Sequence, residues 1–592
     1  MAGHFRLALT VLVALSVVAI STATTTASAT RPHLIYILAD DYGWADADWH
    51  RDANWTEKAT PHLSSLVANG VELDNYYSFK FCSPTRSSIQ SGRNPIHVNV
   101  QNYQPVVWNY VDPSNDPDAG FAGVARNMTG MATMLKSGAG YRTHFAGKWD
   151  CGMATWDHTP EGRGYDTSLF YFHHDNDYWT SRVRADDRSQ TCPGDANQIV
   201  DLFHNKKPAR GLNNTASECM TNGHPYPVDP VTKLPRTSCV YEDQTFLNNI
   251  LGVVDAHPVT EPLFLFWAPH IVHAPLQVPK EFADMYTYVD DPRRATYLAM
   301  VRWLDTAVSN LTATLKRKNM WDNTVVVFSS DNGGPVYCDG CAGANNWPLR
   351  GGKASNWQGG IRVNAFVSGG LIPIAARGTK LTGLATAWDI YGTFAHLAGV
   401  DPTDHKAAAA GLPPVDSVNQ WEYFSGATTT PPRTVVPVGS SSCITQGPGC
   451  INQWGWGPIN ETRTIVQALI FDDGKEGKQD LWKLILGAAP YSGWTGPKFP
   501  NGSKTNFTNG HCDFTTGCLF HLSADPNEHV DLSGEAAQEA RKKRMLALLK
   551  THNETTFSPD RGPGETDPHV LDKPCAAAHN EWNGFWGPFL TE

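Results

Sequence analysis

The sequence predicts an α/β fold in which a large, mixed but mostly parallel sheet lies between helices. Three short apolar runs are typical of buried strands, and each ends just before polar residues: 33–39, 262–268 and 324–330. Between the last two, leucines and valines recur at three- and four-residue spacing from Leu298 to Leu315, as in an amphipathic helix. Alternating strands and helices predict an α/β sandwich.

Residues 1–29 are predicted to be a secretory signal peptide. His4 and Arg6 precede an apolar run over residues 7–20, and Ala27-Ser28-Ala29 resembles a cleavage site. The apolar run is too short to cross a bilayer comfortably, so we favour cleavage over a membrane anchor. No later run is long and apolar enough to span, and we expect no transmembrane segment after cleavage.

The remaining chain is predicted to form two parts. Residues 30–430 carry the strand and helix patterns of a catalytic α/β domain. Within them, residues 180–240 are polar and contain three cysteines, which indicates a disulfide-tied insertion. Residues 431–592 are richer in Gly, Ser, Pro and Asn, and the strand-like LWKLILG (481–487) indicates a smaller α+β subdomain with a short antiparallel sheet.

The composition argues against some classes of binding partner. The net charge of −11 over 592 residues provides no basic face for nucleic acid, and an anionic ligand would need a local cationic site. Twelve cysteines and several N-x-S/T sequons, together with the signal peptide, predict a disulfide-bonded glycoprotein of the secretory pathway, either secreted or lysosomal. The sequons begin at Asn54, Asn127, Asn213, Asn310, Asn460, Asn501, Asn506 and Asn553.

The cysteine spacing predicts local loop disulfides, although connectivity cannot be derived from spacing alone. The close pairs are Cys338/Cys341, Cys443/Cys450 and Cys512/Cys518. Setting Cys82 aside leaves an odd number of cysteines, a hint that Cys82 has another role.

Two strand ends carry oxygen ligands. Asp40 and Asp41 follow the first apolar run, and Asp331 and Asn332 follow the third. Either motif alone is more often a solvated turn. Together they favour a hard cation, Ca²⁺ or Mg²⁺, because such ions prefer carboxylate and amide oxygens.

Several cations are candidates for the same site. Lys148 follows the strand-like YRTHFA, His273 lies in VHAPLQVP, and Arg350 and Lys353 lie in a glycine-rich loop. Each alone is more often an ordinary surface or core residue. A metal with Lys, Arg and His side chains is nevertheless what a tetrahedral oxyanion would require in an acidic protein.

Cys82-Ser83-Pro84-Thr85-Arg86, followed by Ser91-Gly92-Arg93, resembles the C-x-P-x-R…G-R signature of the type I sulfatase family, within the alkaline-phosphatase-like superfamily. The order of motifs DD, C-x-P-x-R, GKW, H-x-P, DNGG and RGxK is also similar. The resemblance covers about residues 31–425 and resumes at 521–532. Within the family, segments 94–102, 262–279 and 345–363 are most similar to the arylsulfatase B group, the N-acetylgalactosamine-4-sulfatases.

The resemblance implies an alkaline-phosphatase-like sandwich and a sulfuric ester hydrolase of the arylsulfatase type, acting on carbohydrate or aryl sulfates. It implies that a formylglycine-generating enzyme oxidises Cys82 to Cα-formylglycine, whose hydrated aldehyde attacks sulfur. One Ca²⁺ would be held by Asp40, Asp41, modified Cys82, Asp331 and Asn332. The implied roles are support of the nucleophile for Arg86, neutralisation of sulfate for Lys148 and Lys353, and contact with the ester and leaving oxygen for His273. A helix starting near Pro84 would direct its N-terminal dipole at the anion.

Two departures from the family pattern stand out. The usual G-K-W-H is here Gly147-Lys148-Trp149-Asp150, so a carboxylate replaces the histidine that contacts the formylglycine hydroxyl. Asp150 could act as the base for aldehyde re-formation, and it also adds negative charge near a dianionic intermediate, which should weaken that intermediate. We therefore expect reduced activity or a changed substrate range. Gln358 replaces a usual Glu, which we expect to affect support rather than chemistry. Two alternatives stay open: a phosphodiesterase or phosphonate hydrolase of the same superfamily, and a catalytically impaired binder of sulfated glycans.

Overall fold

The computed structural model describes Met1 and residues 31–591 with several gaps. The gaps are residues 99, 101, 103, 113–120, 184–191, 193–198, 215–217, 222, 339, 442–464, 475–477, 502–509, 514, 558, 560–561 and 563–566. The predicted signal peptide and the Cys443/Cys450 pair therefore lie outside the described residues. Residues 31–592 cluster as one compact unit, and the predicted boundary near residue 430 stays a prediction.

A ten-stranded mixed sheet forms the centre of this unit and confirms the predicted fold class. In spatial order its strands are β11 (Thr379–Leu381), β2 (Val71–Leu73), β10 (Ala365–Ser368), β9 (Thr324–Ser330), β1 (His33–Ala39), β8 (Leu263–Ala268), β4 (Arg142–Lys148), β5 (Thr167–Tyr171), β6 (Phe203–His204) and β7 (Lys207–Pro208). The five strands from β9 to β5 are parallel, whereas β10 and β6 run antiparallel to their neighbours. The three predicted strands are β1, β8 and β9.

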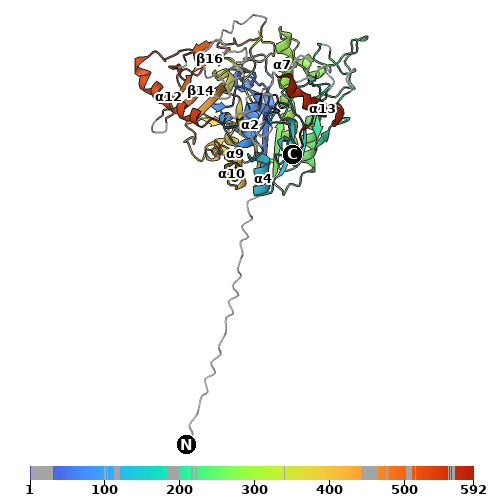
Figure 1. Cartoon of the computed structure of the whole chain (residues 1–592), viewed down its shortest axis with the longest axis horizontal. Coiled ribbons are helices and arrows are strands. Elements are labelled where there is room, and N and C mark those ends of the chain that lie inside the picture. The colour runs from blue at the N-terminus through green and yellow to red at the C-terminus, as the bar shows by residue number, and fades with distance from the viewer. Residues whose placement is uncertain are drawn as a thin grey trace. The chain divides into compact units, whose positions relative to one another are not determined.

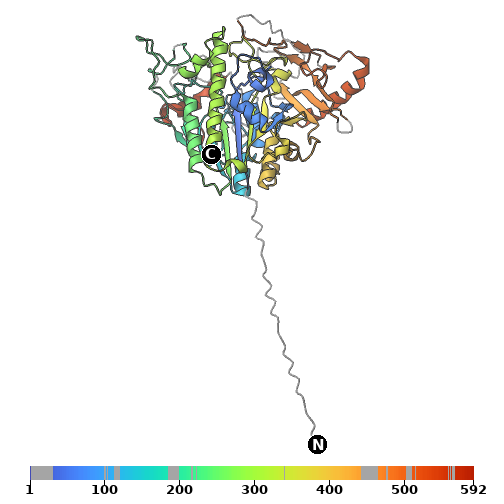
Figure 2. The same ribbon diagram turned by 180° about the vertical axis from the view of Figure 1, so that it is seen from behind.

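Helices cover both faces of the sheet. One set, in front in Figure 1, consists of α2 (Cys82–Ser91), α4 (Met131–Ala139) and α9 (Asp389–Ala398), which contact one another. The other consists of α1 (Pro61–Ala68), α5 (Glu242–Ala256) and α7 (Pro292–Arg317); α5 and α7 are the green helices in front in the reverse view, Figure 2. Helix α7 contains the predicted amphipathic stretch, and the leucines and valines of that stretch are buried.

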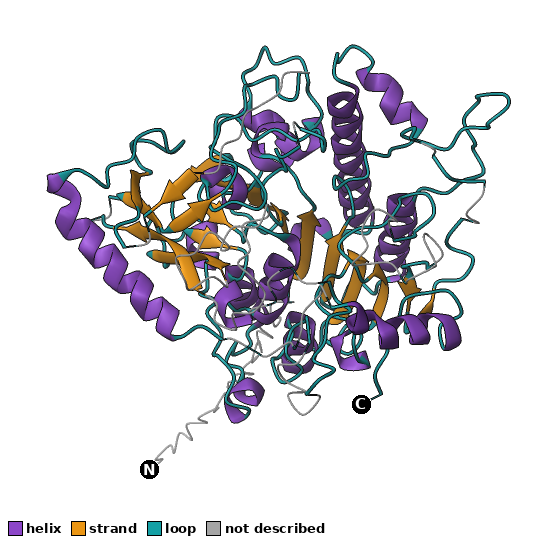
Figure 3. Cartoon of the chain, turned by 45° about the horizontal axis from the view of Figure 1, so that its top comes forward, coloured by secondary structure: helices purple, strands orange, loops and turns teal. Residues whose placement is uncertain are grey.

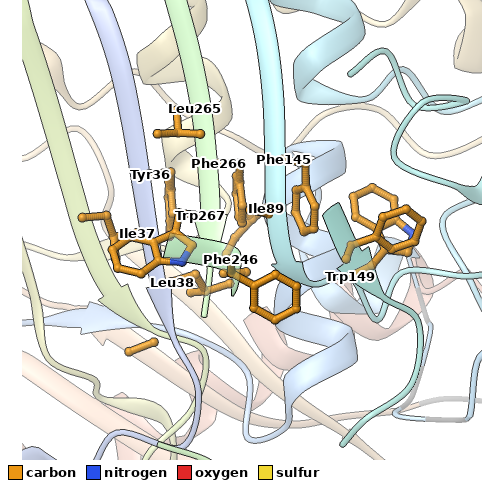
Figure 4. Packing of buried hydrophobic residues seen from close by; sticks show 14 of the residues in the cluster. Tyr36, Ile37, Leu38, Ile89, Phe145, Trp149, Phe246, Leu265, Phe266 and Trp267 are labelled. Atoms are coloured by element: carbon orange, nitrogen blue, oxygen red, sulfur yellow. The ribbon is translucent and has the colours of Figure 1, made fainter. Parts of the chain in front are cut away.

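The sheet register explains the aromatic packing in the core (Figure 4). Phe266 of β8 is the cross-strand partner of both Tyr36 on β1 and Phe145 on β4. Its ring stacks on Tyr36 with centroids 4.9 Å apart and on Phe145 with centroids 5.6 Å apart. Such pairs stabilise neighbouring strands, and they fix the strands whose carboxyl ends carry the site.

A four-stranded antiparallel sheet confirms the predicted smaller sheet (Figure 3). Its order is β13 (Val435–Ser441), β14 (Ile465–Asp472), β15 (Leu481–Ile485) and β18 (Cys518–His521), and α12 (Glu539–Glu554) packs on β14. The predicted strand 481–487 is wrong at its end: β15 stops at Ile485, and Gly487, with a φ of 72°, begins β16 (Gly487–Ala489). β16 pairs with β17 (Gly510–Cys512).

The other α-helices and β-strands of the described chain are short. They are β3 (Tyr76–Tyr77), β12 (Ala385–Thr386), α3 (Pro95–Val98), α6 (Lys280–Ala283), α8 (Gln358–Ile361), α10 (His405–Ala409), α11 (Trp421–Phe424) and α13 (Asp572–Asn580). Within the described ranges, no helix has the length and apolar character needed to cross a membrane.

The described disulfides tie distant parts of the chain together. Cys219–Cys239 lies within the predicted insertion, but Cys192 of the same insertion pairs with Cys575 in α13, which the sequence did not indicate. The local pairs Cys338–Cys341 and Cys512–Cys518 are present as expected. Among the described cysteines, Cys82 and Cys151 are outside any disulfide, and both are buried.

Candidate active site

The predicted site residues meet at the carboxyl edge of the large sheet. Asp40 and Asp41 follow β1, Asp331 and Asn332 follow β9, and Lys148 is the last residue of β4. These strands are parallel, so their carboxyl ends open on the same side, where α/β proteins place their ligands. Cys82 is the first residue of α2, and this helix directs its amino end toward the same edge.

Cys82 lies against a cluster of carboxylates. Its thiol donates to Asp40 Oδ1 over 3.6 Å. Single ligand atoms of Asp40, Asp41, Cys82 and His273 all lie within 4.8 Å of one another, and all four residues are buried. Burial raises the pKa of the Cys82 thiol well above its ordinary value, although Lys148 and Lys353 oppose this shift. The unmodified residue is thus a protonated thiol, which is a weak nucleophile.

Arg86, one turn after Cys82, links the two strand ends. Its guanidinium donates to Asp331 Oδ2 from Nη2 at 2.8 Å and from Nε at 3.1 Å, and Nη2 lies 3.4 Å from Asp40 Oδ2. Nη1 donates to the carbonyl of Lys148 at 3.0 Å. Burial alone would lower the pKa of Arg86, but the charges of Asp331 and Asp40 outweigh it and raise the pKa. The guanidinium therefore joins the carboxyl ends of β1, β4 and β9 to α2.

Two lysines neutralise the aspartates. Lys148 Nζ lies 2.8 Å from Asp40 Oδ2, and Lys353 Nζ lies 2.7 Å from Asp41 Oδ1. Burial opposes the charged form of each lysine, yet the neighbouring aspartates raise both pKa values above the ordinary range. The site therefore keeps two ammonium groups beside Cys82, which is favourable for a bound oxyanion.

The contacts of the Asn332 side chain indicate whether these residues fit a hard cation. Its Nδ2 donates to Asp41 Oδ1 at 2.7 Å, whereas its buried Oδ1 has no hydrogen-bond partner among the described residues. An unpaired buried amide oxygen is unfavourable unless something else satisfies it. Together with the carboxylates of Asp40, Asp41 and Asp331, this oxygen fits a Ca²⁺ site.

His273 faces the same centre as a neutral imidazole. Its Nδ1 lies 2.6 Å from the carbonyl of Ala274, to which it must donate. Its Nε2 lies 3.2 Å from Lys353 Nζ and 3.4 Å from Asp41 Oδ2. Burial and the positive charge of Lys353 lower the pKa of His273 well below its ordinary value. Nε2 of the neutral ring therefore accepts a hydrogen bond from the ammonium of Lys353, the nearer of its two contacts.

Asp150 follows β4 in a left-handed conformation, with a φ of 51°. Its buried carboxylate lies 3.8 Å from Lys148 Nζ and contacts His174 Nδ1 at 2.9 and 3.0 Å. Burial would raise the pKa of Asp150, but the charge and hydrogen bond of His174 outweigh it and lower the pKa. Sequence reasoning missed His174. Its only signal was its place just after β5, the parallel neighbour of β4.

Arg350 and Gln358 lie outside this cluster. The Arg350 guanidinium is stacked between Trp357 and Trp494, 3.7 and 4.5 Å from the ring centroids, and donates to backbone carbonyls. Gln358 accepts from Tyr77, and its backbone N–H donates to Glu528 beside the smaller sheet. Arg350, a candidate cation by sequence, therefore supports the fold instead of facing the anion.

Cys82 at the amino end of α2, beside carboxylates and cations at the carboxyl edge of the large sheet, is an arrangement that suits an anionic ester and is consistent with the alkaline-phosphatase-like class of hydrolases. The comparison of sequences specifies the family: residues 32–400, more than half of the chain, match the family described as Sulfatase. The chain belongs to the type I sulfatase family and is thus a sulfuric ester hydrolase.

Known relatives agree with this family. The chain is 31% identical to arylsulfatase J of Mus musculus over 96% of this chain and 82% of the relative. It is 24% identical to N-acetylgalactosamine-6-sulfatase of Homo sapiens over 88% of this chain and 86% of the relative. Among solved structures, the PsFucS1 sulfatase from Pseudoalteromonas sp. has a TM-score of 0.62 at 20% identity, covering 90% of this chain and 92% of the other. That likeness shows the fold.

Proposed function

We propose that this chain hydrolyses sulfate esters through a formylglycine made from Cys82, with one bound Ca²⁺. The observation that carries the proposal is the position of Cys82: a buried cysteine outside any described disulfide, at the start of α2, 3.6 Å from Asp40 and close to Lys148 and Lys353. An ordinary structural cysteine has no need of these neighbours. The C-x-P-x-R sequence around it fits recognition by a formylglycine-generating enzyme in the secretory pathway.

Asp40, Asp41, Asp331, Asn332 and modified Cys82 would hold the Ca²⁺, which would polarise a sulfate oxygen and favour deprotonation of the hydrated aldehyde. Other side chains position the nucleophile, bind the sulfate and transfer the proton. Arg86 positions the nucleophile through Asp331 and the Lys148 carbonyl. Lys148 and Lys353 bind the sulfate charge, and His273, whose Nε2 is directed at Lys353, contacts the ester. Asp150 would take a proton from the second hydroxyl when the aldehyde re-forms.

The substrate class we propose is a sulfated carbohydrate or aryl sulfate. Support comes from the names of relatives, which include an N-acetylgalactosamine-6-sulfatase and an arylsulfatase. A structural relative, Ps i-CgsB, was solved in complex with k-i-k-neocarrahexaose (TM-score 0.60, 22% identity), although this likeness concerns the fold alone. We further propose that the protein enters the secretory pathway and acts outside the cell or in lysosomes.

Turnover of an aryl sulfate tests the proposal. Protein secreted from a eukaryotic host should release the phenol from 4-nitrophenyl sulfate, and a Cys82→Ala variant should not. Faster turnover of an aryl phosphonate than of the sulfate would favour the phosphonate-hydrolase alternative. Binding of sulfated glycan without turnover of either ester would replace the proposal with a glycan-binding role.

A further inference from the structure

Two histidines at the site have opposite hydrogen-bond environments. His273 has a carbonyl oxygen at Nδ1 and an ammonium donor at Nε2. His174 has the Asp150 carboxylate at Nδ1, 2.9 and 3.0 Å away, and the carbonyl oxygen of Asn102 at Nε2, 3.1 Å away. Carboxylate and carbonyl oxygens only accept, so both ring nitrogens of His174 must donate. This arrangement needs the doubly protonated imidazolium.

The charge count at the site indicates what the second proton on His174 does. Among the described side chains, four carboxylates (Asp40, Asp41, Asp150 and Asp331) are in contact with three permanent cations (Arg86, Lys148 and Lys353). Asp150 thus leaves the cluster one negative charge in excess. A cationic His174 balances this charge. A divalent ion would then leave the centre positive by about two charges toward an anionic ester.

We propose that His174 is a positioning residue that cancels the charge of Asp150 and holds its carboxylate beside Lys148, so that a carboxylate at this position is compatible with anion binding. This inference deepens the proposed function and rests on it. It explains how the chain carries an acid in the place where its family usually has a histidine: the positive group has moved to the end of the neighbouring strand.

The contacts of His174 also reach the nucleophile helix. Asn102, whose carbonyl accepts from His174, has its side-chain Oδ1 3.2 Å from the hydroxyl of Ser83. Ser83 follows Cys82 in α2. A continuous series of contacts therefore joins Asp150, His174, Asn102 and Ser83, from the end of β4 to the first turn of α2. Through it, His174 fixes Asp150 relative to residue 82.

The charge state of His174 can be measured without turnover. Protein labelled with [13Cε1]histidine should give a signal that is lost in His174→Gln and keeps the shift of an imidazolium from pH 6 to 8. The reference is His144, at the opposite end of β4, whose pKa burial lowers to about 4 and whose signal should be that of neutral imidazole. A His174 signal that titrates near 6.5 or is neutral at pH 7 would overturn the inference.

Binding of inorganic sulfate to the Ca²⁺-loaded full chain tests the electrostatic role. His174→Gln keeps a hydrogen-bond donor but loses the charge, and we expect about tenfold weaker sulfate binding by calorimetry. The double variant Asp150→Asn/His174→Gln removes both charges and should return to within about twofold of the starting affinity. A purely structural role predicts no such rescue.

The outcomes separate the inference from the proposed function. If the starting protein neither binds sulfate nor hydrolyses aryl sulfates, the proposed function fails, while the histidine spectrum still decides the charge of His174. If it does hydrolyse them, and sulfate affinity is unchanged in His174→Gln or is not restored in the double variant, the electrostatic role of His174 is wrong. His144→Gln is the matched control and should bind sulfate normally.

Discussion

Buried ionisable groups are neutral at the amino ends of two strands of the ten-stranded sheet, β1 and β4, and charged at the carboxyl ends of the same strands. At the amino ends, His33 of β1 and His144 of β4 are both neutral, with pKa values lowered to about 4 chiefly by desolvation. The geometry agrees for His33, whose Nδ1 accepts from the backbone N–H of Leu263 at 3.2 Å. At the carboxyl ends of the same two strands, Asp40 and Lys148 form a fully buried ion pair.

The difference shows what keeps charge inside a protein. Burial alone removes the charge from a titratable group, as at the amino ends. At the carboxyl edge each charge faces an opposite one, and Arg86 joins Asp40 to Asp331. Such a network is a weak source of stability but presents fixed charges to a ligand without further reorganisation. The following predictions test this contrast.

Replacing Cys82, the proposed nucleophile, should have the largest effect. Cys82→Ala removes the side chain that we propose becomes formylglycine, and kcat/KM for an aryl sulfate should fall by about 10⁴-fold or more. The folded state should persist, because Cys82 is in no described disulfide. Circular dichroism provides the folding control. Residual turnover within tenfold of the original would show that Cys82 is not the nucleophile.

Removing one cation should have the next largest effect. Lys148→Met keeps much of the volume but leaves the ester without one ammonium group, and kcat/KM should fall by about 10²–10³-fold. Lys136→Met is the control, since Lys136 pairs with Asp166 away from the site and is half exposed. Equal activity of the two variants would contradict the assignment of the carboxyl edge as the anion site.

Asn332→Ala should weaken Ca²⁺ binding by about tenfold or more, because it removes the buried oxygen that has no described protein partner. Calorimetric titration of the chelator-treated protein measures this. Chelation should also abolish turnover, and Ca²⁺ should restore it. If Asn332→Ala binds Ca²⁺ as tightly as the original protein, Asn332 is not a ligand.

Replacing His144, near the amino end of β4, should change the free energy of unfolding in acid and leave the turnover of sulfate esters unchanged. Because folding lowers the pKa of His144 from 6.5 to about 4, the unfolded chain binds more protons between these values. Stability from this group is therefore full above pH 6.5 and is lost as pH falls toward 4, by about 1–3 kcal/mol. In His144→Gln, the free energy of unfolding measured in urea should differ less between pH 5 and pH 7 than in the original protein. An unchanged pH dependence would contradict the neutral state of His144.

The sequence predicted the elements that are defined by long apolar runs. The runs 33–39 and 324–330 match β1 and β9, and 262–268 differs from β8 by one residue. The short strands β6, β7 and β11, at or next to the edges of the sheet, could not be predicted, because two or three residues of ordinary composition become strands only by pairing with a neighbour.

That candidate site residues lie together was predictable where their motifs follow parallel strands, as for Asp40 and Asp331. The proposed role of His174 was not predictable, because it depends on Asp150 and Asn102, which are 24 and 72 residues away along the chain. The same holds for Cys192–Cys575, separated by 383 residues. The sequence offered both Arg350 and Lys353 as candidate cations of one glycine-rich loop, and the position of the Arg350 guanidinium between two tryptophans depends on residues elsewhere in the chain.

The most direct test of the central claim is the mass of the tryptic peptide 81–86, which Lys80 and Arg86 delimit, from protein secreted by a eukaryotic host. Conversion of the Cys82 thiol to an aldehyde predicts a mass about 18 Da below that of the cysteine peptide. An intact thiol despite a competent modifying enzyme, or Cys82 found in a disulfide, would contradict the proposed mechanism.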